Sequence, residues 1–552
     1  MSPAALSPAH AQLRTTEIEV HTDAIDLTDR ERVATDAGGA FVQFLSPRTK
    51  STIDDGGCSV DSAFQFADVA VRPVLYSSLL LMLTNAVQVG WAATQLNLST
   101  FHDKKDCDAR PVAPGTCVMF PGHTASEWTW AVNVLFVSGM FGCLLTGRLA
   151  DHFGRKRLAL MNAVLAIIGC AIQGVAPSIS VYIVGRLVSG FSSGISTTLP
   201  HSYINEISPP HLRDLLGATY QVGLSAGILI VTGTFFVGGN SPGWRYISAA
   251  PMVFAAICLI GGLAGGMVES PVWLLTKGRR ADAEHEIGRL FGHENASYIL
   301  AYAESRGDEA STLERQPSAL STSSDSESRS SAVERPSALR QLFSATYRRQ
   351  ATLAIALAMI QQLSGINAVF LYSSSMFTDA GLSDARVGSL VVNIVNFLPS
   401  LCAGSLGARF GIRRVMIAGA AVMMLCAAGV TLSLLVDVAP LSIAFMALYV
   451  AAYAVSLGPL VYVVVAAIFP DELRATGTAV CLTANWSSTL LVGICYPYIA
   501  DALGDLGFLP FIIILGLSAL FMSRSLPETS GKTGDEIQAM FQQRKSVDAS
   551  PQ

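Results

Sequence analysis

Charged residues are scarce in this chain. Asp, Glu, Lys and Arg make up 14% of its 552 residues, whereas soluble domains average about 25%. Apolar residues make up 51%, and the mean hydropathy is +0.46. The net charge of −5 contains no basic excess, so the sequence predicts no nucleic-acid partner. This composition is typical of a protein that crosses a lipid bilayer several times.

The sequence also lacks the patterns of an enzyme. It contains no Gly-rich nucleotide loop, no metal-ligand spacing of His or Cys, and no hydrolytic combination of Ser, His and Asp. We therefore expect no catalytic activity, no cofactor and no metal site. The ten cysteines are too few for a disulfide scaffold, and most lie in apolar runs. Cys107 and Cys117 flank a polar loop, where a disulfide and two free thiols both remain open.

No secretory signal is visible at the start, and residues 1–70 are polar. We predict that they form a disordered cytoplasmic tail. Beyond them lie twelve apolar runs that meet the length of roughly 20 residues needed to cross a bilayer. The runs cover residues 75–98, 126–146, 158–176, 181–204, 214–238, 245–267, 349–376, 385–407, 413–436, 440–466, 475–500 and 506–525.

The basic residues predict the orientation of the spans. Arg148 and the run Arg155–Arg157 follow the second span, while Arg409, Arg413 and Arg414 follow the eighth. Short loops rich in Lys and Arg face the cytoplasm, so both termini are predicted to be cytoplasmic. The predicted parts are the N-terminal tail 1–70, an N-terminal six-helix bundle 71–267, a helical and Ser-rich cytoplasmic linker 268–348, a C-terminal six-helix bundle 349–525 and a cytoplasmic tail 526–552.

The two bundles repeat short motifs at a nearly constant offset. The segment Gly147–Arg157 resembles Gly404–Arg414, and Pro209–Arg213 resembles Pro470–Arg474. Two six-helix repeats are an architecture of secondary transporters, whose substrate site lies near the membrane midplane between the repeats. The fold class predicted is therefore an all-α membrane protein with twelve transmembrane helices in the major facilitator arrangement.

One span carries an unusual number of polar groups. Gln361, Gln362, Ser364 and Asn367 lie within the apolar run 351–377, where an unpaired polar group costs several kcal/mol. Amides are donors and acceptors at once, which suits a neutral solute with many hydroxyls. Gln361 and Asn367 are six positions apart, about 240° round a straight helix. Either the helix breaks at Ser364–Gly365, or one amide binds a neighbouring helix.

Taken together, the motifs resemble the sugar porter family of the major facilitator superfamily, and the facilitative hexose transporters in particular. The resemblance covers roughly residues 72–530. Besides the repeated segments, it rests on Gly185-Arg186, Pro200–Glu206, Gln221, Glu269–Trp273, Gln361–Asn367, Asn485-Trp486 and Pro527–Thr529.

The resemblance implies a site for one hexose between the bundles. The implied sugar ligands are Gln221, Gln361, Gln362, Asn367, Asn396 and Asn485, with Trp486 and Tyr462 as aromatic walls. Leu371 and Tyr372 fall at the implied outer gate, and Gly365 is the predicted pivot. As an alternative, Asn393 and Asn396 merely bridge helices. Ala454 replaces a frequent Glu, a departure that resembles hexose transporters of apicomplexan parasites.

Charged residues at helix ends have a predicted mechanical role. Ion pairs there latch the outward-facing state and break when the inner side opens. The predicted latch consists of Asp151, Arg155, Lys156, Glu206, Arg213 and Arg245. In the C-terminal bundle, Ala408 and Ala467 replace acidic residues of the family pattern. We therefore predict a weaker latch in that bundle.

The first span, 75–98, contains no Asp or Glu, and Ala92 stands near the position where proton-coupled relatives carry an acid. A span without an acid has no carboxylate with which to carry a proton. The sequence thus favours a uniporter whose partners are a hexose and the lipid bilayer. The resemblance to the family implies the plasma membrane as its location, and we expect the protein to be a monomer. A proton-coupled hexose or polyol symporter, and a sugar receptor with little flux, remain the alternatives.

Overall fold

The computed structural model describes residues 71–98, 100–102, 107–113, 115–240, 242–297, 299–300, 338–371, 384–530, 532 and 536–541. The predicted N-terminal tail, the Ser-rich part of the linker and Tyr372 lie outside these residues.

The first half of the chain forms helices whose ends follow ordinary capping rules. Thr124 forms a capping box with Glu127 at the start of α4, and Ser178 caps α6. Pro73 and Pro210 begin helices in which their missing N–H costs nothing. The helices are α2 (Pro73–Thr94), α4 (Ala125–Phe153), α5 (Arg155–Val175), α6 (Ile179–Ile207), α7 (Pro210–Gly238), α8 (Gly243–Ala249), α9 (Met252–Leu263), α10 (Pro271–Thr276) and α11 (Arg280–Phe291).

The second half has the same plan, with more interruptions. A bend of 46° separates α16 from α17 near Pro399, and Ser456 separates α19 from α20. The helices are α13 (Ala338–Leu342), α14 (Arg348–Leu363), α16 (Ala385–Ser400), α17 (Ala403–Phe410), α18 (Ile412–Leu435), α19 (Ala439–Val455), α20 (Leu457–Ile468), α21 (Asp471–Leu503), the 3₁₀ turn η2 (Gly504–Leu506) and α22 (Leu509–Ser525).

The chain is a multi-pass membrane protein. Nine described spans are long and apolar enough to cross a membrane, and the bent pair α16–α17 makes ten. The other two predicted spans contain the 17-residue α22 and α14, which resumes as helix over 366–371 after a short break. All twelve predicted runs therefore contain helix.

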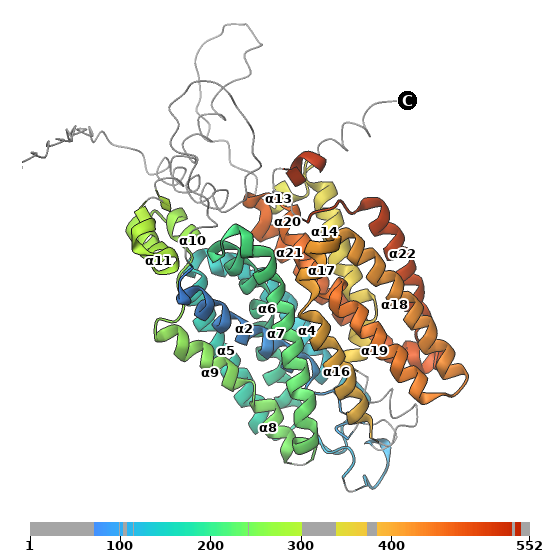
Figure 1. Ribbon diagram of the computed structural model, residues 1–552. Helices are drawn as coiled ribbons and strands as arrows, with labels where there is room; N and C mark the ends of the chain where they lie inside the picture. The colour runs from blue at the N-terminus through green and yellow to red at the C-terminus, as the bar shows by residue number, and fades with distance from the viewer. Residues whose placement is uncertain are drawn as a thin grey trace, which may run out of the picture.

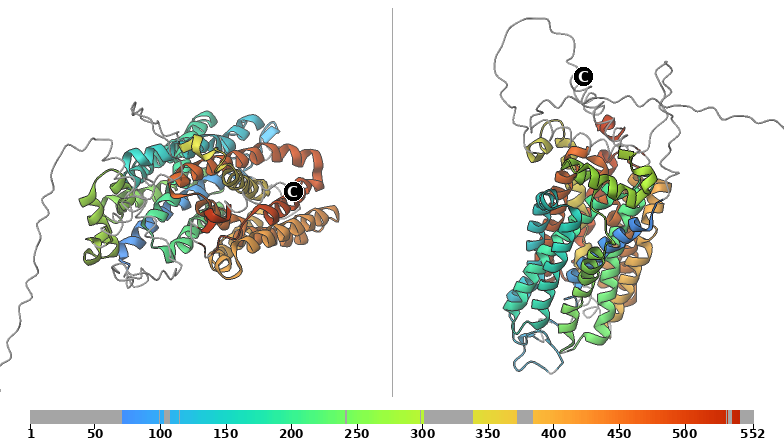
Figure 2. Two further views of the ribbon diagram at one scale, coloured as in Figure 1. Left: turned by 90° about the horizontal axis from the view of Figure 1, so that it is seen from above. Right: turned by 90° about the vertical axis from the view of Figure 1, so that its left-hand side faces the viewer.

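The two halves lie side by side, with the first half in blue and green and the second in yellow to red (Figure 1). The helices run roughly parallel to one long axis (Figure 2). Contacts between the halves are made by α4 with α21, and by α7 with α16 and α20. We call the extremity that carries α10 and α11 the linker end. The opposite extremity, which carries α8 and the described parts of 95–124, is the loop end.

Candidate functional site

Four amide side chains meet between α14 and α21. The Gln361 side chain donates to the carbonyls of Leu457 and Gly458 at 3.0 and 2.6 Å. Its Oε1 accepts from Asn485 Nδ2 at 2.6 Å and from Gln362 Nε2 at 3.2 Å. Gln362 also donates to Asn485 Oδ1 at 2.9 Å. We call Gln361, Gln362, Asn367 and Asn485 the amide cluster.

The amide cluster depends on a break in its own helix. α14 ends at Leu363, and Gly365 has a φ of +97° before helix resumes at Ile366. The break brings Asn367 back to Gln362, so that Asn367 Nδ2 lies 2.5 Å from Gln362 Oε1. Both alternatives raised by the spacing are realised, because the helix breaks and the Gln361 amide also binds the neighbouring α20.

A second polar line joins α7 to α16 across the interface of the halves. Asn396 Nδ2 donates to Ser225 Oγ at 3.1 Å, and Asn393 Nδ2 donates to Thr232 Oγ1 at 2.9 Å. Both asparagines thus bridge helices here, as the alternative reading expected. Their Oδ1 atoms are buried and accept no hydrogen bond from the described residues. Gln221, also buried, lies one turn before Ser225 on α7.

Two aromatic rings of the second half contact the first half. The Trp486 ring contacts Phe136 of the other half with a centroid distance of 5.9 Å. It passes so close to α4 that a Cβ added at Gly139 would lie 2.2 Å from it. Tyr462 contacts His201 at 4.9 Å and Tyr220 at 6.2 Å. Trp486 and Tyr462 thus lie at the interface of the two halves.

A cavity of about 150 Å³ opens between the halves on the linker side of the amide cluster. Its wall includes Ala358, one turn from Gln361. The lining also includes Arg155, His201, Glu206, Tyr462 and Arg474. His201 Nδ1 donates a hydrogen bond to the Thr197 carbonyl at 2.7 Å. Its buried Nε2 has no partner among the described atoms.

The halves are in contact on the loop side of the amide cluster. Asn97 Nδ2 donates to the Phe370 carbonyl at 2.8 Å. Leu371, from the predicted gate, is buried in an apolar cluster with Trp128, Phe136 and Trp486. The arrangement is therefore closed toward the loop end and hollow toward the linker end.

Part of the predicted charge latch is paired. The prediction that these pairs break when the inner side opens is wrong for Arg155, because its ion pairs are intact while the cavity opens toward the linker end. Arg155 lies 2.9 Å from Glu206 and 3.3 Å from Asp151, which joins α4, α5 and α6 of the same half. Lys156 contributes through its backbone N–H, which donates to Glu269 at 3.0 Å. The Arg213 side chain lies outside the described part of the structure.

Arg245 was wrongly assigned to this latch. Its guanidinium donates to the carbonyls of Gly174 and Ala176, at the end of α5 opposite to Arg155. α5 has 21 residues, so these ends are about 30 Å apart at 1.5 Å per residue. The prediction failed because span 245–267 enters from the loop end, so the start of that span is far from the cytoplasmic loops.

Two carboxylates accept hydrogen bonds from the first backbone N–H groups of a helix. The sequence predicted no role for either of them. Glu269 Oε1 accepts from the N–H groups of Arg155 and Lys156 at 2.7 and 3.0 Å. Glu528 Oε1 accepts from the N–H groups of Ile412 and Arg413 at 3.0 and 3.5 Å. Each compensates the partial positive charge of a helix start.

Burial raises the pKa of the Glu269 carboxyl above its ordinary value, although N–H donors from Lys156, Ser270 and Arg155 oppose that rise. In both halves, a glycine stands at the start of a helix, and the Glu that binds this helix start follows some 115 residues later. The pairs are Gly154 with Glu269 and Gly411 with Glu528. This repetition in the sequence could have predicted the role of the two carboxylates.

The equivalent positions of the second half lack the ion pair. Ile412 stands where the repeat has Arg155, Ala408 where it has Asp151 and Ala467 where it has Glu206. The neighbouring Arg413 instead donates to the Ser523 carbonyl at 2.5 Å. Its buried Nε has no partner among the described atoms.

A multi-pass bundle of two similar halves, with a polar site at their interface and a cavity toward one end, defines a secondary transporter of the major facilitator fold. The family model "Sugar (and other) transporter" matches residues 82–541. The chain belongs to this sugar transporter family and is not an enzyme.

Individual relatives agree with this assignment. The chain is 33% identical over 439 residues to the human solute carrier family 2, facilitated glucose transporter member 4, covering 77% of this chain and 82% of that protein. It is 34% identical over 439 residues to member 1 from Gallus gallus, covering 77% and 84%. The solved structure of the proton:xylose symporter XylE bound to 6-bromo-6-deoxy-D-glucose has a similar fold, with a TM-score of 0.68 at 21% identity, covering 85% of this chain and 99% of that chain.

Proposed function

We propose that this protein is a facilitative hexose transporter that moves glucose and related hexoses across the plasma membrane by alternating access. The amide cluster carries the proposal. It gathers four uncharged side chains with several donors and acceptors in the second half, next to Trp486, whose ring contacts Phe136 of the first half. Such a set can pair with the hydroxyls of a neutral sugar, whereas an ion would need charged ligands.

The sugar ligands in this proposal are Gln221, Asn396 and the amide cluster, and Trp486 and Tyr462 offer faces to the sugar ring. The amides already hydrogen-bond one another, so sugar binding exchanges these bonds for sugar contacts. Each such bond contributes only about 0.5–1.5 kcal/mol net, which makes the exchange nearly balanced. Leu371 closes the loop end, Tyr372 is the second gate residue, and Gly365 is the pivot of the gating segment.

We infer uniport from the first span. α2 (Pro73–Thr94) contains no carboxylate, and Ala92 stands at the position expected for one. Downhill flux driven by the sugar gradient is therefore the expected mode. The protein is expected to act as a monomer, with both termini in the cytoplasm and without a cofactor.

Flux of radiolabelled glucose into proteoliposomes that contain the purified full-length protein tests the proposal. The expected result is flux down the sugar gradient that does not change when a pH gradient of either sign is imposed. Accumulation against the sugar gradient with an inward proton gradient would instead indicate a symporter. Saturable sugar binding without flux would indicate a receptor, and preference for inositol over glucose a polyol carrier.

A further inference from the structure

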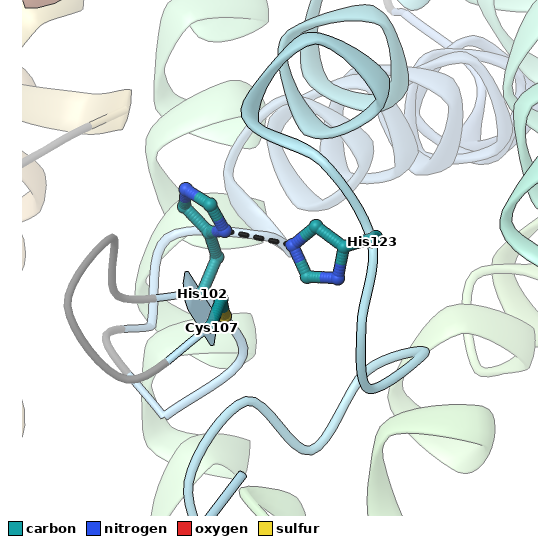
Figure 3. Close-up of side chains that lie close together, drawn as sticks. All are labelled: His102, Cys107 and His123. Carbon is teal, nitrogen blue, oxygen red and sulfur yellow. Dashed lines mark hydrogen bonds between the residues drawn. The ribbon is translucent and has the colours of Figure 1, made fainter. Parts of the chain in front are cut away.

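Two histidines meet at the loop end, away from the candidate sugar site. His102 Nδ1 lies 2.7 Å from His123 Nε2 (Figure 3). Both rings stack on Trp128, with centroid distances of 4.8 and 5.1 Å. His123 is almost fully buried, and Cys107 is close by. Residue spacing alone did not indicate this pair, because the two histidines come from opposite ends of a long connection.

His123 is held in the form that a metal ligand needs. Its Nδ1 lies 3.1 and 3.0 Å from the carbonyls of Met119 and Phe120. Because a carbonyl only accepts, Nδ1 carries the proton and Nε2 presents a lone pair toward His102. Metal-bound histidines usually donate the other ring N–H to a carbonyl or carboxylate, which fixes the tautomer and the ring orientation.

The disulfide between Cys107 and Cys117 fixes the connection that carries these residues. Sulfur in a disulfide is not a thiolate, which is the metal-binding form of cysteine. The two imidazoles are thus the protein ligands, and solvent completes the coordination. In a tetrahedral site with bonds of 2.0–2.1 Å, two nitrogens lie about 3.3 Å apart. For an ion to enter, the two nitrogens separate by about 0.6 Å, both rings turn so that their lone pairs face the ion, and His102 Nδ1 gives up the proton that it donates to His123 Nε2.

We propose that His102 and His123 form a binding site for a divalent transition metal of the zinc and copper class at the loop end. Imidazole nitrogen is a preferred ligand of these ions. The site lies five residues beyond Asn97, whose side chain contacts the Phe370 carbonyl of the other half. A bound ion ties residue 102 to residue 123 and restrains this contact, so it slows the opening of the loop end.

Titration of the full-length protein in detergent with Zn²⁺, read by calorimetry, tests the site. One ion is expected to bind with micromolar affinity, and His102→Ala and His123→Ala are each expected to weaken binding at least tenfold. His152→Ala, an exposed histidine at the other end of α4, is the matched control and is expected to bind as the unaltered protein does. Equal binding by the His102→Ala/His123→Ala double variant overturns the proposal, as does binding that occurs only after the disulfide is reduced.

Cobalt offers a second measurement that does not depend on folding stability. Co²⁺ bound to the unaltered protein is expected to show visible absorption bands of low-symmetry coordination with nitrogen ligands. These bands are expected to disappear in the His123→Gln variant while its circular dichroism spectrum stays the same. Identical Co²⁺ spectra for the two proteins would overturn the assignment of His123 as a ligand.

The consequence for opening rests on the proposed function and is measured separately. External Zn²⁺ is expected to reduce hexose flux several-fold in proteoliposomes with the unaltered protein, and not with His123→Ala. Undiminished flux at saturating Zn²⁺ overturns the coupling to opening. If the unaltered protein carries no hexose, the proposed function fails, while calorimetry and the Co²⁺ spectra still decide the metal site.

Discussion

At the scale of single residues, Gln361 organises the candidate site. Its side chain is fully buried and holds two carbonyls at the start of α20 while it accepts from Asn485 and Gln362. Few residue types other than Gln combine two donors and an acceptor at this reach. A change at this position therefore affects both the site and the contact between α14 and α20.

Replacing Gln361 with Ala is expected to raise the KM for glucose more than tenfold, because the amide cluster loses its shared acceptor. Gln350→Ala is the matched control. Gln350 is also a buried Gln of α14, but it donates to Gln538 at 2.7 Å, far from the cluster. Both variants are expected to lose about 1–3 kcal/mol of stability from unpaired polar groups. Equal KM values for the two variants in flux assays would contradict the role of Gln361 as a sugar ligand.

His201 provides a second residue-scale test. Its Nε2 lone pair borders the cavity without a partner among the described atoms, so it can accept from a sugar hydroxyl. His201→Phe keeps a ring against Tyr220 and Tyr462 but removes that acceptor. We expect the KM for glucose that enters from the linker end to rise about tenfold, the equivalent of one hydrogen bond of about 1.4 kcal/mol. His152→Phe serves as control, and an unchanged KM in His201→Phe would count against the contact.

At the scale of helices, the break in α14 results from a single glycine. Gly365 has a φ of +97°, and a Cβ added there would lie 2.6 Å from the Phe511 ring. A residue other than Gly in the left-handed region costs about 1–2 kcal/mol, and the clash adds to this. The break is what brings Asn367 back to the cluster.

Gly365→Ala is therefore expected to lower the thermal unfolding midpoint and to reduce hexose flux at least fivefold. Gly504→Ala is the matched control, because Gly504 has a φ of +52° with nothing within 4 Å of an added Cβ. It isolates the backbone strain from the clash, so its midpoint is expected to fall less and its flux to be retained. Equal effects of the two substitutions on flux would show that Gly365 has no special part in gating.

The helices also show which features a sequence can predict. Ten of the twelve predicted spans are found among the described residues when the bent pair α16–α17 counts as one, and the other two runs contain shorter helices. They were predictable because long apolar runs have few alternatives in a bilayer. The break at Gly365 was predictable from amides that cannot share one face of a helix. The partners of Asn393, Asn396 and Arg245 were not, because they belong to helices distant in sequence and depend on how the halves pack. Glu269 and Glu528 were missed for the same reason, since each holds a helix start more than a hundred residues away.

At the scale of the whole molecule, the two halves share a plan but differ in charge at the linker end. The first half has Arg155 paired with Glu206, while Ile412 and Ala467 occupy the equivalent places in the second. Glu206 and Arg155 line the cavity together with Arg474, which comes from the other half. We expect closure of the cavity to bring Arg474, which here donates to the carbonyls of Ala466 and Phe469, toward Glu206. In the repeat, the corresponding pair is Arg213 with Ala467, which has no carboxylate to offer.

This asymmetry predicts the effect of restoring the missing acid. Ile412 is apolar, so the carboxylate of Ala467→Glu has no counterpart of Arg155 beside it while the linker end is open. The described cation close to this position is Arg474, whose guanidinium already donates to the carbonyls of Ala466 and Phe469 at 2.9 and 3.3 Å. A partly buried carboxylate that shares this occupied guanidinium is incompletely compensated, which destabilises the open state. The repeat in the sequence leads us to expect that Arg213 approaches this carboxylate when the linker end closes, as we expect Arg474 to approach Glu206. Both effects favour the outward-facing state, and we expect its population relative to the inward-facing state to rise about three- to tenfold, or about 0.7–1.4 kcal/mol.

Distances between spin labels placed across the halves at the linker end and at the loop end measure these populations in the purified protein. The variant Ala467→Glu/Arg213→Ala isolates the pairing, since it keeps the new charge but removes its partner. If pairing contributes, the ratio of outward- to inward-facing population rises less in the double variant than in Ala467→Glu. The single variant Arg213→Ala completes the cycle from which the coupling free energy is obtained. Identical populations in the unaltered protein and Ala467→Glu would mean that charge at this position does not set the balance between the two states. The weaker latch of the second half would then have no mechanical consequence.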